Sequence, residues 1–318
     1  MQSKPQIQAS HLTKRYLKHG SPAIDDISLE VPSGSLFGIV GPDGAGKTTL
    51  LRILSTVLLP SSGSASLGGF DLRKDTEKIR NLIGYMPQDF SQYPDLSLRE
   101  NLGFFANIQH VPKQAKEERI EKILDFTQLK PFENRKAGKL SGGMKKKLAL
   151  GCAIIHSPRV LLLDEPSTGV DPVSRRELWS MLTNVIIDGV TVVLSTPYMD
   201  EAERCSEVAM LYGGKILTIG SPRDLTNELP YEVLEVKATP RKIMRKVVEE
   251  TPGLLSWNPV GDRLRIAVAT HADGERVLET LERDFKQASA EVRILRFAPR
   301  TMEDVFVRTV SEQREKHD

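Results

Sequence analysis

Residues 41–49 read Gly41-Pro-Asp-Gly-Ala-Gly-Lys-Thr-Thr49 and match the pattern G-x-x-x-x-G-K-[ST]. An apolar run over residues 36–40 predicts a strand before this stretch, and residues 50–54 have the apolar spacing of a buried helix after it. In this order the three segments form a phosphate cradle, because the glycines let backbone N–H groups point inward and the helix N-terminus adds partial positive charge. The sequence therefore predicts a nucleoside triphosphate site formed by Gly41, Pro42, Asp43, Gly44, Ala45, Gly46, Lys47, Thr48 and Thr49. Lys47 is expected to reach the β- and γ-phosphates, and the Thr48 hydroxyl to ligate Mg²⁺.

The composition excludes several other classes of protein. A length of 318 residues favours two domains, and 44 Lys plus Arg against 42 Asp plus Glu leave no overall positive charge for binding nucleic acid. Cys152 and Cys205 lack metal-ligand spacing and suggest no disulfide framework, as in a reducing cytosol. Residues 1–6 lack the apolar core of a signal peptide, and no apolar run approaches the roughly 18 residues of a membrane span. We therefore expect a soluble, cytoplasmic chain that reaches a membrane only through a partner.

Residues 1–222 are expected to form one α/β domain, because strand and helix signals alternate along them. Apolar runs rich in β-branched residues predict strands that are buried on both faces of a mostly parallel sheet, over residues 36–40, 83–86, 160–163, 190–194 and 208–211. Residues 112–128 and 175–187 are predicted as helices. Residues 24–31 and 63–67 suggest a small antiparallel β layer beside the main sheet.

A second, smaller domain is expected after a polar linker over residues 223–230. Its predicted strands cover residues 231–238, 254–257, 264–268 and 292–297, and its predicted helices cover residues 241–250, 275–285 and 302–310. The β-α-β-β-α-β order matches a ferredoxin-like α+β unit over residues 231–311. Residues 312–318 are expected to form a polar tail that frays.

A second phosphate motif ends the strand predicted at residues 160–163. The run Val160-Leu-Leu-Leu-Asp-Glu-Pro166 places two carboxylates at a strand's carboxyl end, the edge where open α/β sheets bind ligands. Asp164 is expected to hold Mg²⁺, and Glu165 to polarise the attacking water as general base. A pair that only caps the strand end is the alternative.

A third motif begins the helix that follows residue 141. In Leu140-Ser-Gly-Gly-Met144, Ser141 is a natural N-cap, and Gly142 and Gly143 leave backbone N–H groups open to an anion. The three motifs in this order resemble the nucleotide-binding subunit of an ABC transporter, over roughly residues 5–222. Leu140–Met144 matches that family's signature motif, with Met144 where Gln is commoner. The resemblance implies an ABC cassette with a helical subdomain, ATP and Mg²⁺ as ligands, and two ATP molecules sandwiched between two cassettes.

The resemblance also assigns residues outside these motifs. Ser141 and Gly143 would act on the ATP of the facing cassette, and Asp171 would lie in the loop that passes between the two sites. Gln88 would contact Mg²⁺ and the attacking water, although a lone Gln in a loop is otherwise a solvated side chain. Tyr16 would stack on adenine, unless it merely packs at a strand end.

One position departs from the family pattern. The family usually places a histidine after the strand predicted at residues 190–194, and this chain has Pro197 there. Proline has no side-chain donor and no backbone N–H. Loss of one preorganised transition-state contact typically lowers turnover by roughly 10²–10³-fold. The site on this chain's own loop is therefore expected to hydrolyse ATP slowly and to pair with a second cassette, unless Thr196, Tyr198 or a water replaces the histidine.

These observations predict an ATPase subunit of an exporter, peripheral on the cytoplasmic face of a membrane. Transmembrane permease subunits would dock near Gln88 and residues 92–105. The end of the chain, residues 298–306, resembles ABC-2-type exporters, and Pro197 and the Gly-Pro-Asp-Gly loop resemble the first cassette of bacterial tandem-cassette exporters. A non-hydrolysing regulatory cassette and a soluble ABC ATPase outside transport are the alternatives. The run Lys145-Lys-Lys147 is expected to be a solvated helix face.

Overall fold

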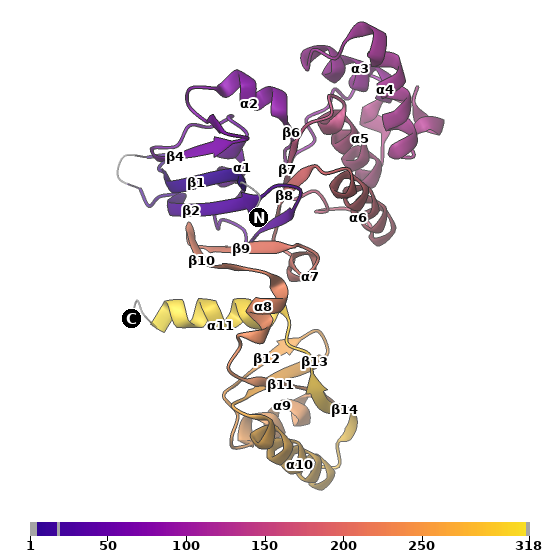
Figure 1. Cartoon of the computed structure of the whole chain (residues 1–318). Coiled ribbons are helices and arrows are strands. Elements are labelled where there is room, and N and C mark those ends of the chain that lie inside the picture. Colours follow the sequence, from indigo (N-terminus) through magenta and orange to yellow (C-terminus); the bar gives the residue numbers. More distant parts are fainter. Residues whose placement is uncertain (1–4, 18–19, 316–318) are drawn as a thin grey trace. The chain divides into compact units, whose positions relative to one another are not determined.

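The computed structural model describes residues 5–17 and 20–315, which form two compact units divided between Pro222 and Arg223 (Figure 1). Residues 1–4 of the first predicted domain, 18–19, and 316–318 of the predicted tail lie outside the described residues. None of the helices in the described part is both long and apolar enough to cross a lipid bilayer.

A six-stranded sheet forms the centre of the first unit. Its order is β10 (Lys215–Gly220), β9 (Glu207–Tyr212), β3 (Leu36–Val40), β8 (Thr191–Thr196), β7 (Val160–Asp164) and β6 (Ile83–Met86). Every neighbouring pair is parallel except β10 with β9. All residues of β3, β7 and β8 are buried, which explains their continuous apolar runs. The expected mostly parallel sheet is therefore present, and β10 is an antiparallel edge strand that the sequence did not predict.

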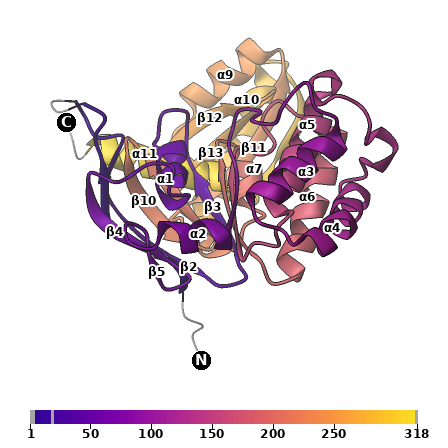
Figure 2. The ribbon, with the colours of Figure 1, turned by 90° about the horizontal axis from the view of Figure 1, so that it is seen from above.

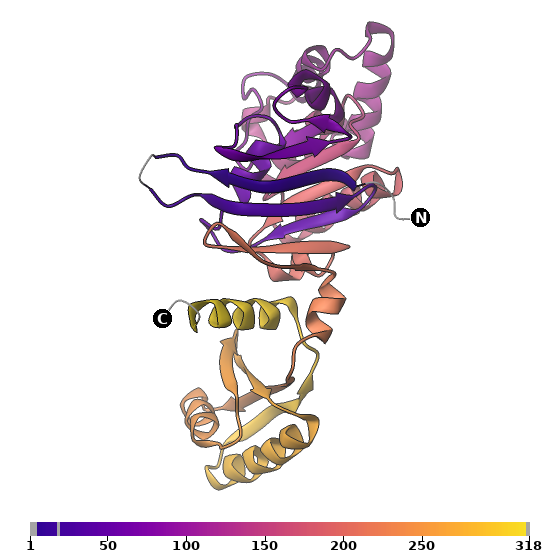
Figure 3. The same ribbon diagram turned by 60° about the vertical axis from the view of Figure 1, so that its left-hand side comes forward.

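A second, antiparallel sheet lies in the same unit, and Figure 3 shows its long strands side by side. Its order is β2 (Ile24–Pro32), β1 (Pro5–Lys14), β4 (Ser62–Leu67) and β5 (Phe70–Asp71). Strands β2 and β4 cover the two segments that were predicted for a small antiparallel layer, and β2 largely alternates between buried and exposed residues. Strands β1 and β5 were missed. Register shifts interrupt the alternation of β1, and β5 is only two residues long.

Helices cover the parallel sheet and form a separate helical layer (Figure 2). They are α1 (Lys47–Leu54), α2 (Thr76–Leu82), α3 (Leu98–Ile108), α4 (Lys113–Phe126), α5 (Gly142–Ile154), α6 (Pro172–Ile187) and α7 (Met199–Ala202), with 3₁₀ turns at Lys130–Phe132 and Ala137–Lys139. Helices α3, α4 and α5 share their own apolar core, which includes Leu102, Leu124 and Leu148. Helix α6 begins before the predicted residue 175, because Asp171 caps it by accepting from the backbone N–H groups of Val173 and Ser174, and Pro172 suits the first helical position.

The second unit has one antiparallel sheet of order β12 (Ser256–Val260), β13 (Arg263–Val268), β11 (Glu232–Thr239) and β14 (Glu291–Ala298). Helices α9 (Arg241–Glu250) and α10 (His271–Gln287) bury one face of the sheet in an apolar core that contains Val248, Leu281 and Phe285. The element order is the predicted one, although β12 starts two residues late, in register with β13. Helix α8 (Pro222–Asn227) occupies part of the expected linker, and α11 (Met302–Glu315) continues into the expected tail.

Candidate functional site

The loop between β3 and α1 is held in shape by its glycines. A Cβ atom at Gly41 would lie 2.2 Å from the Leu211 carbonyl oxygen, and Gly46 has φ +106° with its Cβ position 2.5 Å from the Ala23 oxygen. The buried Lys47 ammonium donates to the carbonyl oxygens of Gly41 at 2.8 Å and Pro42 at 3.0 Å. A cavity of about 260 Å³ lies beside the loop, and its lining is Ala23, Asp43, Gly44, Ala45, Gly46, Lys47, Thr48, Thr49, Gln88 and Glu165.

The three predicted catalytic side chains meet at this cavity. Glu165 Oε1 lies 3.5 Å from Lys47 Nζ, and Glu165 Oε2 accepts from Gln88 Nε2 at 2.9 Å. Thr168, which the sequence reasoning missed, donates to the same oxygen at 3.1 Å. Glu165 adopts a left-handed backbone conformation with φ +48°, which is uncommon for a residue with a side chain and often marks a functional site. A cation, an amide and a hydroxyl therefore orient one carboxylate at the phosphate loop.

Asp164 lies beside Glu165 and is fully buried. Its Oδ1 atom accepts from Thr48 Oγ1 at 3.0 Å and from Ser195 Oγ at 2.6 Å, whereas Oδ2 is buried without a hydrogen-bond partner. Burial raises the pKa of Asp164, and the two hydroxyl hydrogen bonds oppose that rise. Ser195 also accepts from the Glu165 backbone N–H at 3.0 Å, so it ties the Asp164 carboxylate and the Glu165 backbone to β8.

This donor set fits Mg²⁺. Among the described residues no three His, Cys, Asp or Glu side chains form a dedicated metal cluster. Mg²⁺ instead commonly binds one or two carboxylates together with substrate phosphates. Thr48, Gln88 and Asp164 supply hard oxygen atoms at the loop, and Asp164 Oδ2 has its lone pairs free. When bound, Mg²⁺ would neutralise phosphate charge.

Two lysines of α5 are structural, so the prediction of a solvated face is wrong for them. Lys146 Nζ donates to the carbonyl oxygens of Gln88 at 2.9 Å and Glu165 at 3.2 Å, and burial lowers its pKa. Lys147 is buried and forms an ion pair with Glu177 at 2.7 Å. The helical spacing offered one signal, because Lys147 lies four residues after the buried Gly143, on the same face of α5.

Ser141, Gly142, Gly143 and Asp171 do not line the cavity beside the phosphate loop. They gather at the N-termini of α5 and α6. Ser141 caps α5 by accepting from the Met144 N–H at 3.3 Å, and a Cβ atom at Gly143 would lie 2.3 Å from Ser174 Oγ. Backbone N–H groups at the start of α6 lower the pKa of Asp171. The predicted signature motif and the Asp171 loop are therefore neighbours, and they do not line the cavity beside the phosphate loop.

Two further predicted positions, Tyr16 and Pro197, are not part of the lining of the cavity beside the phosphate loop. Tyr16 is 58% exposed, and its hydroxyl lies 3.3 Å from Thr49 Oγ1. Pro197 follows β8 directly. The Thr196 hydroxyl before it donates to the buried Glu201 at 2.6 Å, and the Tyr198 ring after it is covered by the Arg175 guanidinium at 5.1 Å.

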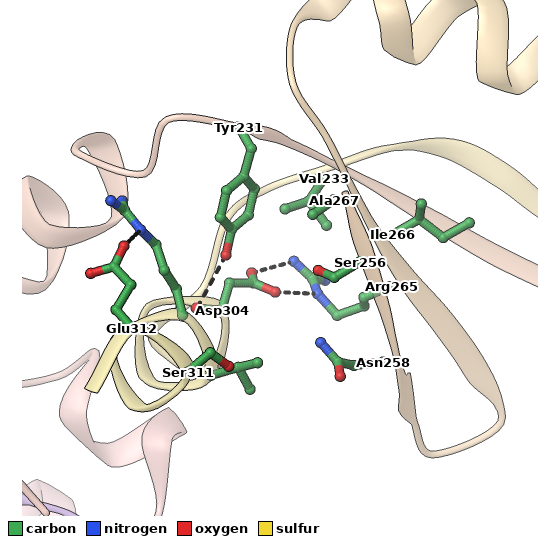
Figure 4. Close-up of a pocket in the computed structure, with 12 residues that line it drawn as sticks. Tyr231, Val233, Ser256, Asn258, Arg265, Ile266, Ala267, Asp304, Ser311 and Glu312 are labelled. Atoms are coloured by element: carbon green, nitrogen blue, oxygen red, sulfur yellow. Dashed lines mark hydrogen bonds and ion pairs between the residues drawn. The ribbon is translucent and has the colours of Figure 1, made fainter. Parts of the chain in front are cut away.

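The second unit has its own cavity of about 400 Å³, between the sheet face and α11 (Figure 4). Each charged residue in its lining pairs with another, Arg265 with Asp304 at 2.7 Å and Arg308 with Glu312 at 2.6 Å. Tyr231 donates to the Asp304 carbonyl oxygen at 3.2 Å. The Arg265–Asp304 pair and the Tyr231 hydrogen bond hold α11 to the sheet side of the cavity, whereas Arg308 and Glu312 pair within α11. No charged residue of this lining is left unpaired for a ligand.

Known proteins of similar sequence are ATP-binding proteins of ABC transporters and exporters. The sequence profile of the ABC transporter family matches residues 24–168. The probable multidrug ABC transporter ATP-binding protein YbhF of Escherichia coli (strain K12) is 45% identical over 223 residues, which are 70% of this chain and only 39% of YbhF. The Nod factor export ATP-binding protein I of Rhizobium etli is 32% identical over 317 residues, covering 98% of this chain and 95% of that protein.

Solved structures share the fold of the first unit. An ATP-binding subunit of an ABC transporter superposes with a TM-score of 0.64 and 25% identity, over 70% of this chain and 92% of the other. The ATP-binding cassette MJ0796, solved as a dimer bound to ADP and Pi, superposes with a TM-score of 0.63 and 24% identity, over 68% and 98%. With the matched profile, the nearly full-length relative and the assembled phosphate site, the chain belongs to the ABC transporter family, as an ATP-binding subunit.

Proposed function

We propose that this chain binds and hydrolyses ATP to drive export. The observation that carries the proposal is the meeting of Lys47, Gln88 and Glu165 at the phosphate loop. In this arrangement the loop N–H groups and Lys47 bind the phosphates, Gln88 orients the attacking water, and Glu165 accepts its proton. Thr48, Gln88 and Asp164 hold Mg²⁺.

The chain works with a second cassette, either another copy or a different chain. Ser141, Gly143 and Asp171 lie outside the chain's own cavity, although backbone N–H groups at a helix start suit an anion. We infer that they complete the ATP site of the facing cassette. The dimeric state named for MJ0796 supports this pairing.

The site on this chain's own phosphate loop is a weakened one, and it is the weaker of the pair when the second cassette is a different chain with a complete site. Pro197 offers no hydrogen-bond donor, Thr196 donates to Glu201, and Tyr198 lies under Arg175, so neither neighbour is placed to replace a histidine. A turnover about 10²–10³-fold below that of a complete site follows. The same observation favours a non-hydrolysing regulatory cassette as the second candidate function.

Export through separate transmembrane permeases is inferred from the names of the relatives, one of which specifies a multidrug ABC transporter and the other Nod factor export. A groove of about 220 Å³ in the first unit supports a docking place, because Gln92 and Phe105 line it together with Tyr85 and His156. We infer that a permease segment at the cytoplasmic face of the membrane docks in this groove, because part of the predicted 92–105 docking region lines it.

Three finer assignments belong to the same proposal. We propose that the chain belongs to the ABC-2-type exporter subgroup and that its first unit corresponds to the first cassette of tandem-cassette exporters. Its second unit is proposed to be a ferredoxin-like accessory domain, since its β-α-β-β-α-β order and antiparallel sheet suit that fold.

Steady-state ATP turnover by the purified chain tests the proposal. We expect slow, Mg²⁺-dependent turnover that Glu165→Gln abolishes while binding of a fluorescent ATP analogue persists, and Lys47→Ala should remove the binding. Binding of the analogue without ATP turnover would favour the second candidate function, a non-hydrolysing regulatory cassette. Brisk turnover that needs Glu165 would contradict the weakened site. Purification from detergent-solubilised membranes should recover a permease with a second cassette, and recovery of ribosomes or DNA instead would refute a transport role.

A further inference from the structure

A fully buried carboxylate, Glu201 on α7, lies close to the site and has no part in the chemistry described above. Its Oε1 atom accepts three hydrogen bonds, from Ser167 Oγ at 2.5 Å, Arg175 Nε at 2.9 Å and Trp179 Nε1 at 3.3 Å. Its Oε2 atom accepts from Thr196 Oγ1 at 2.6 Å. A carboxylate removed from water is tolerated only when it is paired and hydrogen-bonded in this way, so the four donors and Glu201 hold one another in place.

The donors come from segments that meet the proposed general base. Ser167 lies two residues after Glu165, and the next residue, Thr168, donates directly to the Glu165 carboxylate. Thr196 directly follows Ser195, which hydrogen-bonds to Asp164 and to the Glu165 backbone N–H. Glu201 therefore constrains the strained Glu165 backbone from both of its sides.

The third connection leads to the N-terminus of α6. Arg175 lies in the first turns of α6, whose N-cap is Asp171. Trp179 lies one turn further along and is buried, so it reports on this network spectroscopically.

We propose that Glu201 is a positioning residue for Glu165, which acts through Ser167 and Thr196 and links the chain's own site to the start of α6. The inference rests on the proposed ATPase function. It also explains how the loop after β7 keeps its geometry beside Pro197, which supplies no hydrogen bond of its own.

The variant Glu201→Gln distinguishes two possible contributions of Glu201, its hydrogen bonds and its negative charge. In Glu201→Gln the amide oxygen can still accept at the Oε1 position, and the Thr196 hydroxyl can turn to accept from the amide nitrogen. Glu201→Ala removes every acceptor. Asp200→Asn is the matched control, because Asp200 lies on the same helix and contacts the same Arg175 with a side chain that is 63% exposed.

In the full chain, Glu201→Ala should lower kcat for ATP by about 10–100-fold, the size expected when a reacting group is misplaced by about 1 Å. The KM for ATP should change less than about twofold, because the phosphate loop is untouched, and Glu201→Gln and Asp200→Asn should keep kcat within about threefold of the parent. Equal kcat for the parent and Glu201→Ala would overturn the proposal. A loss in kcat that comes with a matching rise in KM would also overturn it. So would a Glu201→Gln variant whose kcat is as low as that of Glu201→Ala.

A second readout does not need turnover. Trp257→Phe leaves Trp179 as the single tryptophan, since the chain has two. In that background MgATP should shift the Trp179 emission, Glu201→Ala should abolish the shift, and Glu201→Gln should keep it. The absence of a shift, or a shift that survives Glu201→Ala, would contradict the proposal.

Folding and nucleotide binding are measured in parallel. If circular dichroism shows that Glu201→Ala is unfolded, Ser167→Ala and Thr196→Val take its place, and unchanged kcat and emission in both would refute the positioning role. Failure of the proposed function has a different signature, in which the parent binds the fluorescent ATP analogue no better than Lys47→Ala. The inference would then fall with it.

Discussion

At the scale of single residues, the site combines carboxylates whose environments differ. Glu165 is met by three donor side chains, whereas Asp164 is buried with one oxygen atom unpartnered. A buried oxygen atom without a hydrogen-bond partner lowers the stability of the folded chain, and proteins retain such atoms where function requires them. The raised pKa of Asp164 has the same cause, because burial disfavours the charged form of the carboxyl group.

Asp164→Asn should stabilise the folded chain at neutral pH. Because folding raises the pKa of Asp164, the folded state binds its proton more tightly, and the free energy of unfolding falls as pH rises from the usual value to the raised one. The variant lacks this loss, so its unfolding free energy should exceed that of the parent by about 1–3 kcal/mol at neutral pH.

Urea denaturation followed by circular dichroism, at about pH 7 and about pH 4, measures the difference, which should shrink at the lower pH. Asp43→Asn is the control, because that side chain is 93% exposed, and it should change stability by less than about 0.5 kcal/mol. A variant less stable than the parent at neutral pH would contradict the account.

Lys146→Met should lower the free energy of unfolding by about 1–2 kcal/mol, because the carbonyl groups of Gln88 and Glu165 lose a donor. Its neighbour Lys145 lies 5.3 Å from the Phe90 ring, a contact worth about 1 kcal/mol or less, so Lys145→Met should cost less. Thermal and urea unfolding of both variants measure the two losses in the free energy of unfolding. Equal losses would mean that the two hydrogen bonds contribute nothing.

At the scale of elements, α5 and α6 approach each other so closely that only glycine fits at position 143. A Cβ atom there would lie 2.5 Å from Ser174 Cβ, which is fixed to the α6 backbone. The close approach brings the Ser141 end of α5 beside Asp171. Packing between two helices thus sets the surface that we propose faces a second cassette.

Gly143→Ala should therefore separate the two helices and cost about 1–3 kcal/mol, despite the better helix propensity of alanine. Ser174→Gly removes the clashing atoms, so the double variant should lose less than the sum of the two single variants. A double-mutant cycle of urea denaturation measures this coupling. Additive losses would show that the contact with Ser174 is not the cause.

The elements also mark where reasoning from sequence succeeded and where it stopped. The buried strands before Gly41 and Asp164 were found, because a run apolar on every residue predicts a strand buried on both faces. Strand β1 was missed because its bulges break the alternation. Lys146 and Glu201 were not recognised as site neighbours, because their partners lie far along the chain and only the folded packing brings them together.

At the scale of the whole molecule, the chain consists of two units with separate apolar cores. The phosphate cavity and its carboxylates belong entirely to the first unit. The cavity with the Arg265–Asp304 pair belongs entirely to the second. Each unit therefore contains the contacts that its own fold requires.

A fragment of residues 1–222 should fold cooperatively and bind the fluorescent ATP analogue within about threefold of the full chain, because domains with their own cores fold as units. Circular dichroism and titration of the analogue test this, with the same fragment carrying Lys47→Ala as the non-binding control. An unfolded fragment, or one that binds far more weakly, would show that the second unit is needed for the site.

The separation of the phosphate loop from the Ser141 end of α5 also has a genetic consequence. In a pair of identical cassettes arranged as proposed above, a lesion at Lys47 would damage the site of its own chain, and a lesion at Ser141 would damage the site of the other chain. Two defective alleles, one of each kind, would place both lesions in one composite site and leave the other intact. The same lesions in cis, opposite a wild-type chain, would damage both. The two alleles should therefore complement each other in trans and fail in cis.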